Sequence, residues 1–280
     1  MALIRTGAFR YNKIWVVESL PKDEPQTGST LYRDLLRRRT GQMPAVSCEL
    51  VQVPTKRNLC RFLKRVVDYV QKKTQLPFLH FEMHGNPKGL ELASGEVMPW
   101  SELANYFRNI NIATRNNLMV SLATCYGGFM FGEISPVIEA PFCGVIGTFS
   151  RVPQREVEEG FYEFFESLLS RDGLDNAVVA LNSANPDNPK FQFISAEGVF
   201  ESVRRDIRKS YSDAEFMRAK IFELTARALK NRNLRNTRSI WDIEYSIERF
   251  LADEREPAIT EMKNVFLMKN LTPLHFREAG

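Results

Sequence analysis

Short apolar runs alternate with helical repeats along the first two thirds of the chain. The runs are typical of buried strands and occupy residues 13–19, 45–53, 76–83, 118–123, 142–149 and 191–195. Between them, apolar residues recur three and four positions apart, as in helices with one buried face, over 31–39, 57–73, 100–107, 154–169 and a short segment from 174. Strands separated by helices predict parallel neighbours joined by right-handed crossovers.

Two further patterns complete the predicted architecture. Residues 90–97 alternate around a Ser-Gly turn and predict a small hairpin, and the first residues after 20 form a polar loop up to Thr30. From 199 to 267 the pattern is helical throughout. The sequence therefore predicts an α/β, three-layer sandwich (1–198) with a mostly parallel sheet of about six strands plus a hairpin, and a helical C-terminal appendage (199–280) packed on it.

Composition and charge limit the classes of protein to which this chain can belong. Hydrophobic residues make up 44% and charged residues 26%, as in soluble globular proteins, and the net charge of +4 is too small to indicate nucleic-acid binding. Long apolar runs are missing and the first residues do not resemble a secretory signal, so we expect a cytoplasmic protein with no membrane partner. The four cysteines form no C-x-x-C pair and are expected to be thiols.

Two predicted strands end in a reactive side chain followed by glycine. The first ends in His84 and Gly85, and the second ends in Cys125, with Gly127 and Gly128 just beyond. If these strands are parallel neighbours, both ends lie at the edge of the sheet where open α/β proteins bind ligands. A thiol close to an imidazole is a candidate nucleophile.

Other interpretations compete with this one. A single cysteine or histidine at a strand end is more often structural, and Cys48 and Cys143 lie inside apolar runs. His80, Glu82 and His84 share one side of a strand, but H-F-E-M-H lacks the H-E-x-x-H spacing of a zinc helix. No G-K-[S/T] follows the glycines, which leaves a nucleotide site unsupported. We expect neither a metal nor a cofactor.

At this point the sequence resembles the caspase-like (clan CD) cysteine peptidases, and within them the bacterial CHAT branch, which is similar to separase. The resemblance covers roughly residues 12–196 and rests on His-Gly and Cys-x-Gly at two strand ends, with further segments at 89–103, 142–152, 161–169 and 174–181. It implies a cysteine endopeptidase acting on a protein substrate. It also implies regulation by a partner or by processing, and a place in bacterial antiviral defence or stress signalling.

The resemblance also implies roles for individual residues. Cys125 would attack the scissile carbonyl, His84 would polarise the bond or protonate the leaving amine, and the amides of Gly85 and Cys125 would form the oxyanion hole. Glu82 would at most position these two residues, without touching the substrate itself. The alternative is a catalytically silent binding or scaffold module with the same fold.

Substrate preference and partner binding are less well defined. Ala123 stands where caspases have a glutamine and metacaspases an aspartate, which leaves Glu18 and Glu133 as candidates for recognising a basic residue. In the C-terminal region, five cations follow one another without an intervening acid, close to Trp241, Ile243 and Phe250: Arg227, Lys230, Arg232, Arg235 and Arg238. This stretch is either a solvated face or a docking surface for a regulatory protein partner.

Overall fold

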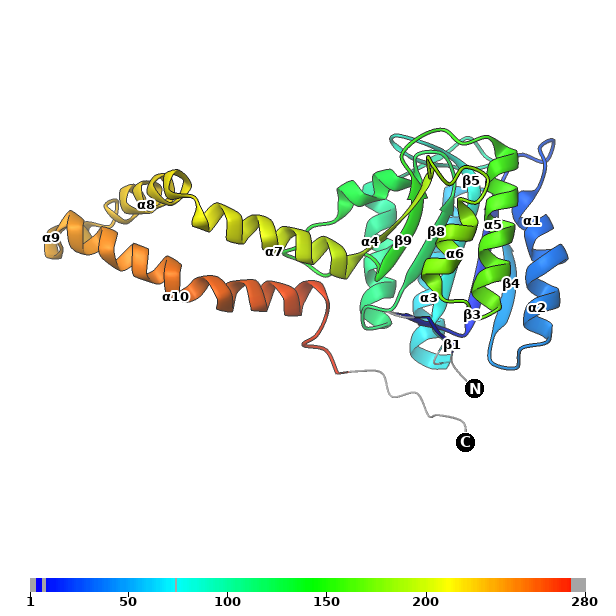
Figure 1. The fold of residues 1–280 in the computed structure, drawn as a ribbon, viewed down its shortest axis with the longest axis horizontal. Helices are drawn as coiled ribbons and strands as arrows, with labels where there is room; N and C mark the ends of the chain where they lie inside the picture. The colour runs from blue at the N-terminus through cyan, green and yellow to red at the C-terminus, as the bar shows by residue number, and fades with distance from the viewer. Residues whose placement is uncertain (1–3, 7–8, 74, 273–280) are drawn as a thin grey trace.

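A six-stranded sheet forms the centre of the protein (Figure 1). The computed structural model describes residues 4–6, 9–73 and 75–272. The strands lie in the order β10 (Phe191–Ser195), β9 (Gly144–Thr148), β8 (Met119–Ala123), β5 (Pro77–Asn86), β3 (Lys13–Ser19) and β4 (Ser47–Gln52). All neighbours are parallel except β10, which is antiparallel to β9. The predicted mostly parallel sheet is confirmed.

Two smaller β-structures accompany the sheet. The end of β5 pairs with β6 (Gly89–Glu91), which pairs with β7 (Val97–Pro99), so the predicted hairpin exists and extends β5 beyond the sheet. A separate two-stranded ribbon joins β1 (Ile4–Thr6) to β2 (Phe9–Tyr11).

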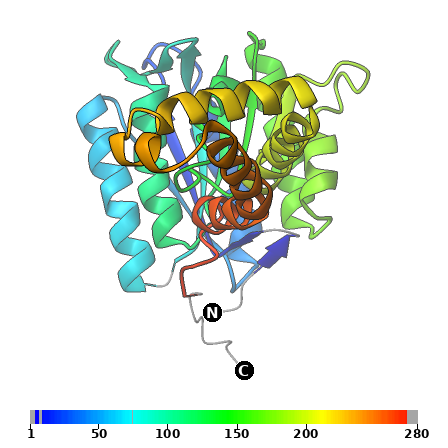
Figure 2. The same cartoon turned by 90° about the vertical axis from the view of Figure 1, so that its left-hand side faces the viewer.

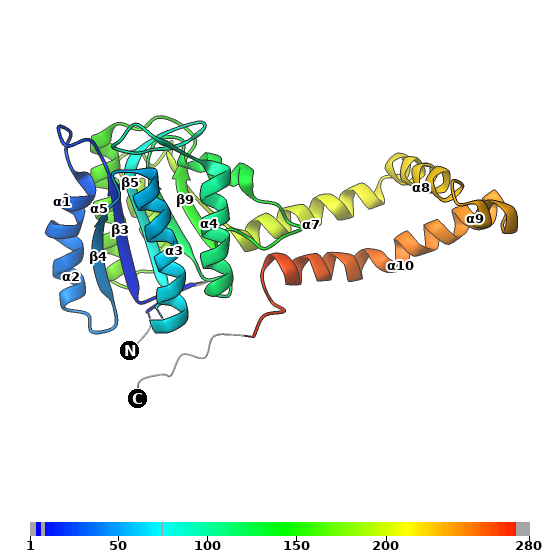
Figure 3. The same cartoon turned by 180° about the vertical axis from the view of Figure 1, so that it is seen from behind.

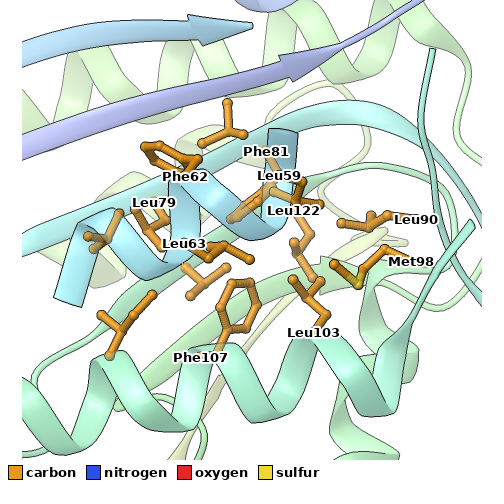
Figure 4. Close-up of a cluster of buried hydrophobic side chains, with 14 of the residues drawn as sticks. Leu59, Phe62, Leu63, Leu79, Phe81, Leu90, Met98, Leu103, Phe107 and Leu122 are labelled. Carbon is orange, nitrogen blue, oxygen red and sulfur yellow. The ribbon is translucent and has the colours of Figure 1, made fainter. Parts of the chain in front are cut away.

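Helices cover both faces of the sheet and make the three-layer α/β sandwich. In Figure 3, α3 (Lys56–Lys73) and α4 (Trp100–Ala113) lie in front of the sheet, and in Figure 1, α5 (Gln154–Leu169) and α6 (Leu174–Leu181) cover the opposite face. The apolar positions repeated at three and four residues in α3 and α4 point at the sheet. Figure 4 shows this core, in which Leu63 and Phe107 from the two helices meet Leu79 and Phe81 of β5.

The first helical segment begins earlier than the sequence pattern predicts. The predicted loop extends to Thr30, whereas α1 (Thr27–Leu31) begins at Thr27 and continues through the π-helical turn η1 (Tyr32–Leu36) into α2 (Arg37–Gly41). Buried carboxylates from the sheet explain the difference: Glu18 accepts from the Ser29 amide at 2.9 Å, and Glu82 accepts from the Thr27 hydroxyl at 2.7 Å. These tertiary hydrogen bonds outweigh the weak helix propensity of a polar segment.

The C-terminal region forms a long arm that points away from the sheet (Figures 1 and 2). The arm consists of α7 (Ala196–Ser212), α8 (Ala214–Ala228), α9 (Arg232–Thr237) and α10 (Ile240–Phe266). The sequence predicted a region packed on the α/β domain; in the structure only its base, at the beginning of α7 and the end of α10, contacts that domain, where Phe200 and Phe266 stack beside Ala140. The rest of the arm projects into solvent.

Within the described residues, none of the helices has the length and apolar character that crossing a membrane requires.

Candidate active site

The pairing of β5 with β8 brings the two predicted reactive residues to one edge of the sheet. The parallel register pairs His80 with Ser121 and Glu82 with Ala123, the last pair of the ladder. His84 and Cys125 follow two positions later on their respective segments. Because side chains alternate between faces, both continue the same row on the face covered by α5. The register therefore leads both residues to the same edge of the sheet.

A cavity of about 200 Å³ opens at this edge, and both His84 and Cys125 line it. Its walls come from the loop after β3, the beginning of α1, the ends of β5 and β8, and the beginning of α5. The other lining residues are Leu20, Glu24, Pro25, Thr27, Glu82, Met83, Ala123, Thr124, Val152, Gln154 and Val157. Both reactive groups therefore border one cavity.

Cys125 is held by the segment that leads into α5. The Val152 amide lies 3.5 Å from its Sγ, and the thiol lies 3.9 Å from the Val152 carbonyl oxygen, so the side chain has a defined direction. Two other thiols are much less suited to nucleophilic chemistry: burial raises the pKa of Cys143 to about 11, and burial also raises the pKa of Cys48. A protonated, buried thiol reacts slowly with electrophiles.

His84 is half exposed and has a carboxylate partner. Its Nε2 lies 2.6 Å from Oε2 of Glu24, in the loop between β3 and α1. A carboxylate on one ring nitrogen fixes the rotation of the imidazole and favours the tautomer that carries a proton there. The second nitrogen is then available as a proton acceptor.

Gly85 allows the backbones of the two strand ends to approach closely. A Cβ at this position would lie 2.5 Å from the Cys125 carbonyl oxygen and would also collide with the Thr124 side chain. After Cys125, Tyr126 adopts the left-handed conformation, with φ +60°, and turns the chain into the 3₁₀ helix η2 (Gly127–Glu133). Among the described residues the Cys125 amide has no protein acceptor, so it can serve as a donor to substrate.

A chain of buried hydrogen bonds extends from the floor of the cavity into the core. Ser121 and Glu82 each lie 2.8 Å from one ring nitrogen of His80, and the second Glu82 oxygen accepts from Thr27 at 2.7 Å. His80 also packs against Phe161 of α5 at a ring distance of 4.7 Å. Both His80 nitrogens are occupied within this chain, so His80 holds Glu82 in place. It does not face the cavity.

The three predicted substrate-binding residues lie in different places. Ala123 lines the cavity directly across from Glu82 in the strand register. Glu18 lies elsewhere: it is fully buried and its carboxylate accepts from Ser29 and Gln52, which makes it a support for α1. Glu133 is at the end of η2 and does not line the cavity.

Glu24 and Glu82 supply the carboxylates of the cavity, and its lining includes no lysine or arginine. Sequence reasoning missed Glu24, because a glutamate in the polar segment P-K-D-E-P, 60 positions before His84, gives no signal of its own. Glu82 was assigned only a supporting role. Two features of the sequence pointed to Glu82 as a residue of the cavity. It lies two positions before His84 on the same side of β5, and it is opposite the small residue Ala123.

The sequence matches no protein-family model, and a comparison with curated proteins also gives no match. The site is thus defined by its own geometry: a thiol and an imidazole at the carboxyl edge of a parallel sheet, above an acidic cavity floor.

Proposed function

We propose that this protein is a cysteine endopeptidase of the caspase-like, CHAT type, in which Cys125 is the nucleophile and His84 the acid–base residue. The observation that carries the proposal is the shared cavity, which His84 and Cys125 both line, each two residues beyond the last pair of the β5–β8 register. Proximity of a thiol and an imidazole is the requirement for nucleophilic catalysis by cysteine.

The geometry supports a two-step acyl transfer. Cys125 Sγ forms a bond to the carbonyl carbon of the scissile peptide while its proton moves to His84. The C–N bond then breaks, His84 gives the proton to the leaving amine, and water hydrolyses the thioester to release the carboxylic acid and restore the thiol. Amides of Gly85 and Cys125 would stabilise the oxyanion, at about 3 kcal/mol for each donor.

Glu24 supports His84 in this mechanism as a positioning residue. Its carboxylate accepts a hydrogen bond from Nε2–H of His84, which leaves the other ring nitrogen for the thiol and the leaving group. An imidazolium formed during the first step is also stabilised by the adjacent negative charge.

The cavity favours a substrate with a basic side chain before the scissile bond. Glu82 lies on the cavity floor with only 3% of its surface exposed, and the small side chain of Ala123 leaves room above it. The partners of the two carboxylates are the histidines His84 and His80, and the lining holds no lysine or arginine, so a basic side chain of the substrate would meet negative charge without a competing cation.

Cleavage profiling on a peptide library with all residues at each position tests the proposal. We expect cleavage after Arg or Lys, abolished by Cys125→Ala and by His84→Ala but not by Cys60→Ala, which changes a thiol outside the cavity. Equal cleavage by Cys125→Ala and the unmodified protein would refute the proposal. Cleavage after other residues would retain the peptidase and refute only the basic preference.

One observation favours the second candidate, a catalytically silent binding module. Cys125 is held by Val152 and His84 by Glu24, and no hydrogen bond joins the two within the described part of the chain. An activity-based acyl electrophile distinguishes the candidates: a peptidase is labelled at Cys125 and loses this labelling with His84→Ala, whereas a silent module gives the same slow labelling with and without His84.

A further inference from the structure

The far end of the arm exposes large apolar side chains. Trp241 is 82% exposed, and Phe222, Tyr245 and Phe250 also lie mainly in solvent. At the base of the same arm, Phe200 and Phe266 are fully buried. Clustered exposed aromatic side chains on a surface usually mark an interaction site.

One of these side chains, Phe250, lines a hollow of about 510 Å³. It lies between α8, α9 and the beginning of α10, at the end of the arm that faces the viewer in Figure 2. Its lining is mainly aliphatic and aromatic: Leu224, Ala228, Leu234, Ile243, Ile247 and Phe250. The hollow is wide enough to take several apolar side chains of a second molecule.

Unpaired positive charge surrounds the hollow. Arg227 and Arg238 line it, Lys230, Arg232 and Arg235 are close in sequence, and residues 224–241 include no Asp or Glu. None of these five cations forms an ion pair in the part of the chain that the structure describes. Cations nearer the base are paired, as in Arg208 with Glu256 at 2.6 Å and Lys263 with Glu201 at 3.0 Å. Asp242 lies close enough to Arg238 to interact with it, but the lining of the hollow itself holds two arginines and no carboxylate. The tip therefore combines an apolar hollow with an excess of positive charge at its rim.

We propose that the arm tip, defined as residues 222–250, docks an acidic amphipathic helix of a partner protein. The apolar stripe of such a helix would fill the hollow, and its carboxylates would pair with Arg227 and Arg238 at the rim. This interaction is independent of the peptidase chemistry.

The charge and shape of the hollow favour an acidic helix over a nucleic acid or a second copy of the chain. A nucleic acid could use the cations and stack on exposed aromatic side chains such as Trp241, but it would leave the hollow, whose lining is mostly aliphatic, unfilled. A second copy of the chain would bring its own basic tip to the same place, and like charges at close range repel.

Peptide display on the full-length protein tests the proposal. The probe is a library of 20-residue helices with Leu or Phe at helical spacing and the polar face randomised among Glu, Lys, Gln and Ser. Peptides are selected on the unmodified protein and counter-selected on Phe250→Ala, so that only tip-dependent binders remain. We expect these binders to be enriched in Glu on the polar face.

Fluorescence anisotropy then measures individual binders against matched variants. Phe250→Ala is expected to weaken binding at least 10-fold and Arg227→Glu with Arg238→Glu at least 30-fold, and changing the peptide's Glu to Lys should restore binding to the latter variant. Val179→Ala and Arg61→Glu, at exposed positions on α6 and α3, serve as controls and should leave affinity unchanged. Circular dichroism confirms that each variant is folded.

Three results would overturn the proposal. Recovered binders could be neutral or basic, or their affinity could survive both tip variants. A 20-nucleotide single strand could bind more tightly than any peptide and lose affinity in the arginine variant, which would assign the tip to nucleic acid. Sedimentation could show self-association that Phe250→Ala abolishes, which would assign it to a second copy.

Discussion

Replacing Glu82 with glutamine isolates the charge at the floor of the cavity. Glutamine has nearly the same volume, and its oxygen can still accept from the Thr27 hydroxyl, which bonds Glu82 at 2.7 Å. Its NH2 group can donate to His80 Nε2 when the His80 proton is on Nδ1, facing Ser121. The substitution therefore removes the negative charge and changes little of the packing around it. Under the proposed function, the loss should fall on basic substrates alone.

The structure allows the size of this effect to be worked out. A hydrogen bond to a charged group contributes about 1.5–3 kcal/mol, and Glu82 is buried, so the bond to a substrate cation belongs in this range. Since about 1.4 kcal/mol corresponds to a tenfold change, kcat/KM for an Arg peptide should fall roughly 10- to 150-fold. A peptide with citrulline in place of Arg has the same shape without the charge and should be nearly unaffected.

The assay compares kcat/KM for the paired Arg and citrulline peptides. Glu18→Gln is the matched control, because Glu18 is an equally buried carboxylate outside the cavity. We expect the Arg-to-citrulline ratio to fall with Glu82→Gln and to stay constant with Glu18→Gln. An unchanged ratio in an active Glu82→Gln enzyme, or an equal fall in both variants, would refute the reasoning.

The remaining predictions concern the backbone, pH and the arm. Gly85→Ala should abolish peptidase activity and lower Tm, because its Cβ would collide with the Cys125 carbonyl, whereas Gly132→Ala, which has open space, should change neither in the same assays. Burial raises the pKa of Cys143 from 9.0 to about 11, so its contribution to stability is complete below pH 9 and is lost as pH rises to about 11. Urea titrations should show this loss, about 3 kcal/mol, only while Cys143 is present; an identical pH dependence in Cys143→Ala would contradict it. Phe200→Ala should lower the free energy of unfolding of the arm's base by about 3–5 kcal/mol and make the arm sensitive to limited proteolysis. Phe222→Ala changes an exposed side chain and should have neither effect. Equal digestion of the two variants would argue against an anchored arm.

The strands and most helices could be predicted from sequence because each has a simple hydrophobic period. Residues 13–19 and 191–195, for example, are apolar runs that become β3 and β10 with the same bounds. Burial of one helix face likewise explains why α3 and α5 were recognised. Local patterning of this kind is independent of which elements become neighbours.

The start of α1, the partner of His84 and the direction of the arm depend on contacts between residues far apart in the sequence. Thr27 and Ser29 belong to a helix only because Glu82 and Glu18 of the sheet accept their hydrogen bonds. The Glu24–His84 contact joins residues 60 positions apart, and only the folded loop brings them together. The direction of the arm was also not predictable, since an amphipathic helix can bury its apolar face against another helix as readily as against a sheet.

Both ends of the arm are fastened at the same place. The chain leaves the sheet at Ser195, where β10 ends, and returns at Phe266, whose carbonyl oxygen accepts from the Ala140 amide at 3.0 Å beside the stacked Phe200. An excursion that starts and finishes at one point can be lengthened, shortened or exchanged beyond Phe200 and Ile259 without rerouting the chain. We therefore expect a chimera with a foreign helical hairpin in place of residues 213–250 to keep the sandwich and to lose only the proposed binding of an acidic helix.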